Sequence, residues 1–169
     1  MGAGDEDFER FFDESFRRAF LVAHRIVGEA AQAEDVAAEA FIRAYARWPR
    51  LGEDPKRVGW VVRVTVNLAI DVTRRRVRLM SGHPADAEDE TVVLRLALVE
   101  ALRRLPERQR QAVALRFLAD MSEADVAAAL GVSTGAVKSH VHRGVSRLKT
   151  LLAAADDHDV EVRLGVEPD

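Results

Sequence analysis

The sequence contains no cysteine, which excludes disulfide bonds and thiolate metal sites and suits a reducing compartment. Long hydrophobic runs are also missing, since none approaches the roughly 20 apolar residues that cross a bilayer. The first ten residues, MGAGDEDFER, are acidic and do not resemble a signal peptide. Runs of β-branched residues are scarce, which favours helix over sheet. We therefore expect an all-α, cytoplasmic protein with no membrane-inserted segment.

The charge of the chain is nearly balanced at −3, yet it is distributed in blocks. Residues 55–78 carry seven Lys and Arg against one acidic residue, and residues 103–149 carry nine against four. The segments before, between and after these two blocks are acidic. Two separate basic blocks predict two surfaces that face polyanions, which the net charge of the whole chain conceals.

Helical spacing organises the first half of the chain. Apolar residues recur every three or four positions over 7–27 and again over 31–46. In the second of these helices Val36, Ala40, Phe41 and Ala44 should face inward. Trp48-Pro49 should end the second helix and begin a loop over 48–54, because the residue before proline is disfavoured in a helix. Asp54-Pro55 then begins a third helix that extends to about residue 78, because its valines still repeat at helical spacing.

Two small helical domains follow from this organisation. The segment 79–91, LMSGHPADAEDET, mixes glycine, proline and acidic residues without a period, as is typical of a linker. Helices over 92–104 and 107–118 should lead into the last motif, and the acidic residues 153–169 should form a poorly ordered tail. We expect one domain over 1–78, a flexible linker over 79–91, a second domain over 92–152 and the tail over 153–169.

Residues 121–149, MSEADVAAALGVSTGAVKSHVHRGVSRLK, predict a helix-turn-helix. Ser122 suits the N-cap of the first helix and Gly131 its left-handed C-cap, while Ser133 or Thr134 can cap the second helix. The second helix has an apolar stripe on one face and hydrogen-bond donors on the other, as a helix that enters the major groove requires. A surface helix with an ordinary solvated basic face is the alternative.

The sequence offers no catalytic site, and we expect neither enzymatic activity nor a cofactor. His140 and His142 are two residues apart on a helix and point to different faces, so they cannot chelate one metal ion. The other histidines are scattered, and no glycine-rich loop that could cradle a phosphate is present. No metal site is predicted.

Two segments, in this order, resemble one family, the extracytoplasmic-function (ECF) sigma factors of bacterial RNA polymerase. AEDVAAEAFIRAYARW (33–48) with GWVVRVTVNLAIDVTRRR (59–76) is similar to sigma region 2, and LRRLPERQRQAVALRFLADMSEADVAAALGVSTGAVKSHVHRGVSRLK (102–149) is similar to sigma region 4. The resemblance implies a three-helix bundle and a helix-turn-helix domain on a flexible linker. It also implies a factor that binds core polymerase and directs promoter-specific initiation.

The resemblance implies that region 2 grips the polymerase and reads the −10 element as a single strand. The residues that match the family's contacts with the β′ clamp helices are Asp35, Glu39, Ala40 and Phe41. A solvated acidic face is the plainer alternative for them. The residues that match −10 contacts or can hold phosphates are Trp48, Arg63, Asn67, Asp71, Arg74, Arg75 and Arg76. Trp48 begins the loop expected to pocket a flipped base.

Region 4 is implied to read the −35 element as duplex DNA and to contact the β flap of the polymerase. The matching exposed positions are Thr134, Lys138, Ser139, His142, Arg143 and Arg147. Three arginines on the preceding helix suit backbone contacts that fix register: Arg108, Arg110 and Arg116. Family members are usually held inactive by an anti-sigma protein. The expected partners are therefore promoter DNA, core RNA polymerase and an anti-sigma protein.

Two other classes of protein are alternatives to this assignment. TGAVKSHVHRGVSRL (134–148) also resembles the recognition helix of response-regulator transcription factors, which bind duplex DNA without being a polymerase subunit. A receiver domain of that class would show alternating strands and helices with a phosphorylatable aspartate, a pattern that residues 31–78 lack. A helical RNA-binding or protein-interaction module is the second rival, and co-purification with polymerase distinguishes it from a sigma factor.

Overall fold

A computed structural model describes residues 3–80 and 90–164, with side chains described within 4–76 and 91–154. These residues form helices and turns with no strand among them, which confirms the all-α prediction. Of the expected linker, residues 81–89 lie outside the described part of the chain. None of the described helices is long and apolar enough to cross a membrane.

The first helical body consists of α1 (Ala3–Val27), α2 (Ala30–Tyr45), α3 (Trp48–Leu51) and α4 (Arg57–Met80). Gly28 has a positive φ of 82° and ends α1, which lets α2 fold back against it. α4 packs on both helices. Phe11 and Phe41 meet in the core between α1 and α2, with ring centroids 5.6 Å apart.

The segment after α2 differs from the predicted loop over 48–54. Residues 48–51 form the short helix α3, with Pro49 in the first turn, where the missing N–H removes no helical hydrogen bond. Trp48 is only 9% exposed, and its ring lies 5.0 Å from that of Phe8 and 5.1 Å from that of Phe11. The burial of this aromatic residue draws the segment against the core and orders it.

The second helical body consists of α5 (Glu90–Arg103), α6 (Glu107–Val113), the π-helical turn η2 (Ala114–Leu118), α7 (Glu123–Leu130) and α8 (Thr134–Leu164). The predicted caps of the helix-turn-helix are confirmed. Ser122 Oγ accepts a hydrogen bond from the Asp125 N–H at 3.1 Å, and Gly131 is left-handed with φ 66°. Ser133, the residue before α8, accepts from the Ala136 N–H at 3.2 Å and so provides the cap of α8.

Two boundaries in the second body differ from the prediction. The helix expected over 107–118 ends in the π turn η2, which no sequence period indicated. α8 continues to Leu164, well past residue 152, where the poorly ordered tail was expected to begin. The sequence over 153–164 contains no glycine or proline, so no residue there forces the helix to end.

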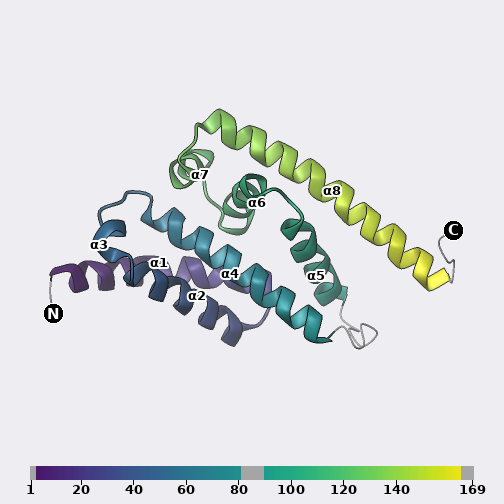
Figure 1. The fold of residues 1–169 in the computed structure, drawn as a ribbon, viewed down its shortest axis with the longest axis horizontal. Coiled ribbons are helices and arrows are strands. Elements are labelled where there is room, and N and C mark those ends of the chain that lie inside the picture. Colours follow the sequence, from purple (N-terminus) through teal and green to yellow (C-terminus); the bar gives the residue numbers. More distant parts are fainter. Residues whose placement is uncertain (1–2, 81–89, 165–169) are drawn as a thin grey trace.

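The two predicted domains are docked against each other. Val62 and Val66 of α4 belong to the same continuous cluster of buried residues as Leu102 of α5 and Leu115 of η2. A second cluster, around Phe11, lies wholly in the first body. α4 therefore lies between the α1–α2 pair and the α5–α7 group, with α8 on the far side of α6 (Figure 1).

Candidate nucleic-acid and polymerase interfaces

The first turns of α8 present the predicted duplex-reading residues to solvent. Val137 is fully buried and anchors one side of the helix in the core. Gly144 lets α8 approach α6 closely, because a Cβ at this position would lie 2.6 Å from Val113 Cγ2. On the outer side of α8, Ser139 is half-buried, and the exposed residues are Thr134, Lys138, His142, Arg143 and Arg147. The structure therefore brings all six predicted residues to the surface.

One of these donors has an acidic neighbour on the other helix of the motif. Lys138 Nζ lies 3.6 Å from a carboxylate oxygen of Glu123, in the first turn of α7, and both side chains are well exposed. An exposed ion pair of this kind contributes little to stability. It does place a carboxylate next to the ammonium group of Lys138, where any other anion that binds Lys138 would have to displace it.

The three arginines expected to contact the DNA backbone also hold the second body together. Arg108 donates to the carbonyl of Leu130 at 3.4 Å, and Arg116 donates to that of Met121 at 3.2 Å. Arg110 donates to the carbonyl of Arg103 at 3.4 Å. Leu130 and Arg103 are the last residues of α7 and α5, where carbonyls lack intrahelical partners, and Met121 lies in the connection between η2 and α7. These three side chains therefore have a structural role, which is to join segments of the second body through hydrogen bonds to backbone carbonyls.

The predicted −10 residues of α4 are less exposed than the donors of α8. Arg63, Asn67 and Arg74 are half-buried, while Asp71, Arg75 and Arg76 are exposed. Asp71 pairs with Arg74 at 3.8 Å, and Arg76 pairs with Glu29, just before α2, at 3.5 Å. Arg63, Asn67, Asp71 and Arg74 share one stripe of α4, whereas Arg75 and Arg76 turn away from it.

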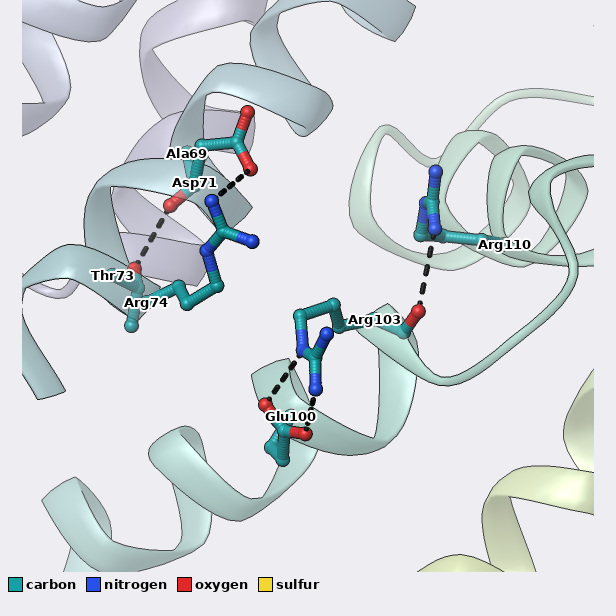
Figure 2. A network of polar contacts seen from close by, with 7 residues as sticks. All are labelled: Ala69, Asp71, Thr73, Arg74, Glu100, Arg103 and Arg110. Carbon is teal, nitrogen blue, oxygen red and sulfur yellow. Dashed lines mark hydrogen bonds and ion pairs between the residues drawn. The ribbon is translucent and has the colours of Figure 1, made fainter. Parts of the chain in front are cut away.

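Polar groups of both bodies meet near the end of α4 (Figure 2). Glu100 of α5 accepts two hydrogen bonds from Arg103, at 2.6 and 2.9 Å. These bonds lower the pKa of the Glu100 carboxyl, against the opposing effect of its partial burial, and the charges of Arg103, Arg104 and Arg74 add to the lowering. Arg74 therefore feels a carboxylate of the other body, and its Nε is buried with no hydrogen-bond partner.

Trp48 lies on the wall of a surface hollow of about 330 Å³ between α1, α3 and the start of α4. The residue is nevertheless largely buried, so little of its ring is available to a ligand. Arg57, across the hollow, stands over the Phe11 ring at 5.6 Å and donates to the carbonyl of Gly52 at 2.7 Å. The main role of Trp48 in this structure is therefore in the core, which the prediction of a DNA contact did not include.

The structure corrects the predicted polymerase contacts on α2. Ala40 and Phe41 are 0% and 2% exposed, so their side chains are core residues with no surface to offer a partner in this structure. Asp35 is exposed, and Glu39 is half-buried. The apolar surface beside these carboxylates belongs instead to Ile42 and Tyr45.

Ile42 and Tyr45, which the sequence analysis missed, are 63% and 52% exposed. They follow Asp35 and Glu39 at helical spacing, so the same periodicity that placed Phe41 inward could have identified them. Tyr45 donates a hydrogen bond to Asp5 of α1 at 3.0 Å, and this bond raises the pKa of its phenol. Glu39 accepts from Arg43 at 2.8 Å. The face is a mixed apolar and charged surface.

Metal binding has no candidate in the part of the chain that the structure describes, because no group of three or more His, Asp or Glu side chains gathers there. The geometry supports binding surfaces of three kinds. These are a row of donors on α8, a polar and basic side of α4, and a mixed face on α2.

Comparison with known proteins finds two regions of one family in the chain. The model of sigma-70 region 2 matches residues 11–79, and that of sigma-70 region 4 matches residues 95–148. The chain is 33% identical over 140 residues to an RNA polymerase sigma-E factor of Streptomyces coelicolor, with 79% of each protein covered. It is 31% identical over 153 residues to the ECF RNA polymerase sigma factor SigL of Mycobacterium tuberculosis, covering 83% of this chain and 86% of SigL.

The fold is similar to one in a solved complex of the sigma factor RpoE with the anti-sigma factor NepR from Bartonella quintana. The TM-score is 0.52 at 23% identity, over 88% of this chain and 98% of the matched one. This likeness concerns the fold alone.

Proposed function

The chain belongs to the extracytoplasmic-function sigma factors of bacterial RNA polymerase, and we propose from that premise how its surfaces divide promoter recognition. A sigma factor binds core polymerase and directs initiation at specific promoters. We assign region 2 to the first body and region 4 to the second. The response-regulator alternative is not supported, because the region 2 model covers residues 11–79, where such a protein would carry a receiver domain.

We assign reading of the −35 duplex to the exposed side of α8. Lys138 and Arg143 are long donors that reach guanine edges or phosphates, and Ser139 is short enough for one close contact only. Thr134, His142 and Arg147 are further exposed side chains of α8, and the whole set spans about four turns. The capped helix-turn-helix holds these groups on a rigid element, as major-groove recognition requires.

We assign capture of the −10 single strand to α4 and the hollow beside α3. Arg63, Arg74, Arg75 and Arg76 would hold phosphates, and Asn67 and Asp71 would meet base edges. The hollow has a size that suits one flipped base, and the edge of Trp48 lies in its wall.

We assign the grip on the β′ clamp helices to the outer face of α2, with Asp35 and Glu39 as its acidic part and Ile42 and Tyr45 as its apolar part. Exposed apolar side chains flanked by charges are suited to a protein interface. Region 4 is assigned the contact with the β flap. The chain would work in the cytoplasm and contribute no catalytic group, and an anti-sigma protein would cover its basic surfaces.

The observation that carries this proposal is the row of uncovered donors on a helix whose opposite side is locked into the core by Val137. The test is run-off transcription by core polymerase with the purified chain on genomic fragments, followed by sequencing of the RNA starts. Specific starts are expected, and their complete absence on all fragments would refute the assignment. Lys138→Ala with Arg143→Ala should lower −35-dependent initiation by about tenfold or more, at roughly 1–3 kcal/mol per base contact.

The matched control is Arg18→Ala. It removes an exposed arginine of α1 that lies on none of the assigned surfaces. This variant and the double variant should both co-purify with core polymerase as the unaltered chain does. Initiation with Arg18→Ala should remain unchanged.

A further inference from the structure

The hollow between α1, α3 and the start of α4 has two kinds of lining. Its aromatic residues, Phe11 and Trp48, are 2% and 9% exposed, so little of either ring can meet a ligand. The rest of the lining is mostly charged and contains three acidic and two basic side chains: Asp7, Glu14, Glu53, Arg10 and Arg57. A ligand in this hollow is therefore chosen by hydrogen bonds and charge more than by stacking.

Arg57 is the fixed hydrogen-bond donor of the hollow. One of its Nη atoms donates to the carbonyl of Gly52 at 2.7 Å, and its guanidinium stands over the Phe11 ring at 5.6 Å. These two contacts hold the group in one place. A guanidinium has five N–H donors in a plane, so one bond to a carbonyl leaves others for an acceptor inside the hollow.

The acidic side chains of the hollow differ in what they contact. Asp7 forms an exposed ion pair with Arg10, at 3.7 Å between Oδ1 and Nη1. Glu14 and Glu53 are exposed, and neither carboxylate forms a hydrogen bond or ion pair with another residue that the structure describes. An ionised carboxylate can only accept hydrogen bonds. These two side chains are therefore free to accept from a ligand that carries N–H donors.

We infer that the hollow selects a base with an exocyclic amino group (cytosine, adenine or guanine) and rejects thymine, with Glu14 and Glu53 as specificity-determining residues. This inference rests on the proposed function, which places one flipped base in the hollow. An amino group donates to a carboxylate, as cytosine N4 does, and each of these bases has an acceptor beside it for Arg57. Thymine has one N–H between two carbonyl oxygens, so a carboxylate that approaches it meets an acceptor on either side.

The same carboxylates determine which part of the strand enters. Glu14 and Glu53 repel a phosphate, so the backbone remains outside while the base enters. Arg50 is exposed on α3 directly after Pro49 of the wall and does not line the hollow itself. It is therefore suited to a phosphate that flanks the flipped base.

The test compares bases that differ at the amino group. Promoters are first identified from the RNA starts made by the unaltered holoenzyme. Labelled single-stranded oligonucleotides of their −10 non-template strand are then altered one position at a time, with uracil for cytosine and hypoxanthine for adenine or guanine. The first two exchanges replace the amino group by oxygen, and the third removes it. Fluorescence anisotropy measures the affinity of the holoenzyme for each strand.

At one position the exchange should weaken binding by about tenfold or more. The double variant Glu14→Gln with Glu53→Gln should reduce this penalty to less than about threefold, because an amide can donate to oxygen where a carboxylate cannot. Each single variant should remove part of the penalty, which keeps the test available if the double variant fails to fold. The matched control is Glu9→Gln, at an exposed residue of α1 that does not line the hollow, and it should keep the full penalty.

Three results would overturn the inference. The first is a strand in which no position depends on the amino group, and the second is a dependence that every glutamine variant retains in full. The third is a double variant that no longer binds core polymerase, because its carboxylates would then meet a cationic side chain of the polymerase. Failure of the proposed function is distinguishable, since the unaltered holoenzyme would then make no specific starts, and this inference would fall with it.

Discussion

The two surfaces of this sigma factor that we assign to DNA are similar in chemistry and differ in what covers them. On α8, Lys138 and Arg143 project from a helix whose inner side alone is packed, and they face solvent. On α4, Arg63 and Arg74 project from a helix that is packed on two sides, against α1–α2 and against the second body. Both helices carry basic residues at helical spacing. The covered side of α4 becomes apparent only when the two bodies are seen together (Figure 1).

This difference fits two separate tasks for the two surfaces. The surface on α8 would read duplex DNA, and the surface on α4 would bind the separated strand. A surface that reads duplex DNA can remain open in the free chain, because duplex DNA is present throughout the genome and its non-specific binding is weak and reversible. A surface that binds single strands would also bind other single-stranded nucleic acids.

The largest expected effect concerns the shared core. Leu102→Ala, in the second body, should lower the free energy of unfolding by about 2–5 kcal/mol, because it leaves a cavity at a site only 2% exposed. Both tryptophans, Trp48 and Trp60, lie in the first body, so their fluorescence reports on that body alone. The fluorescence midpoint in urea should nevertheless shift together with that of far-ultraviolet circular dichroism.

The matched control for this prediction is Leu94→Ala, on the same helix but at a residue 59% exposed. It should leave both midpoints nearly unchanged. If Leu102→Ala changed the dichroism midpoint without the fluorescence midpoint, the two bodies would unfold independently and the buried cluster that contains Val62 and Leu102 would not act as a common core.

A smaller effect separates the two DNA surfaces directly. Arg143→Ala should weaken duplex binding by roughly 1–3 kcal/mol in both the free chain and the holoenzyme. Arg63→Ala should weaken binding of the −10 strand by the holoenzyme and have little effect on single-strand binding by the free chain, since its side of α4 is covered there. Equal losses for Arg63→Ala in both states would mean that this surface is open from the start.

Glu123→Gln should produce a weaker effect of opposite sign. The substitution removes the carboxylate 3.6 Å from Lys138 Nζ and frees that ammonium group for DNA. Duplex binding should tighten by about 0.2–1 kcal/mol, the range of exposed ion pairs, and the gain should diminish as salt rises. Fluorescence anisotropy at two salt concentrations measures both quantities, and a gain independent of salt would argue against this electrostatic origin.

The smallest effect concerns the outer face of α2, which like α8 is uncovered. Tyr45 is the single tyrosine, so ultraviolet absorbance reports its ionisation alone. Its pKa is raised in the folded chain by the hydrogen bond to Asp5, so the pair's contribution to stability is present at neutral pH and is lost as pH rises through the folded pKa. Asp5→Ala should move the titration midpoint down towards 10.0. An unchanged midpoint would mean that this bond does not form in solution.

Local patterns predicted the helices and the caps because those features depend on residues close together in sequence. Ser122 meets its N–H partner three residues away, and Gly131 takes a left-handed conformation that other residues disfavour. The periodicity also placed Phe41 inward correctly. Assigning Phe41 to the polymerase interface as well was inconsistent with that placement, because a side chain 2% exposed cannot serve both purposes.

Other features depended on contacts between distant segments. Proline spacing predicted a loop after α2, but Trp48 packs between Phe8 and Phe11, some 40 residues earlier in the chain, and draws that loop into a helical turn. Gly59 of α4 is a similar case, because a Cβ there would overlap the methyl group of Ala129 on α7, although nothing in its own segment requires a glycine. Its reason is Ala129, which lies in the other body.

The sequence by itself determined the helices, their caps, the two-domain division and the family. Each of these features depends on residues within a turn or two of one another or on motifs of fixed spacing. Only the tertiary structure decided which basic surface is open and which is covered. That outcome depends on the free energy of packing two distant apolar surfaces together, and periodicity within one helix carries no information about which partner its second apolar side will meet.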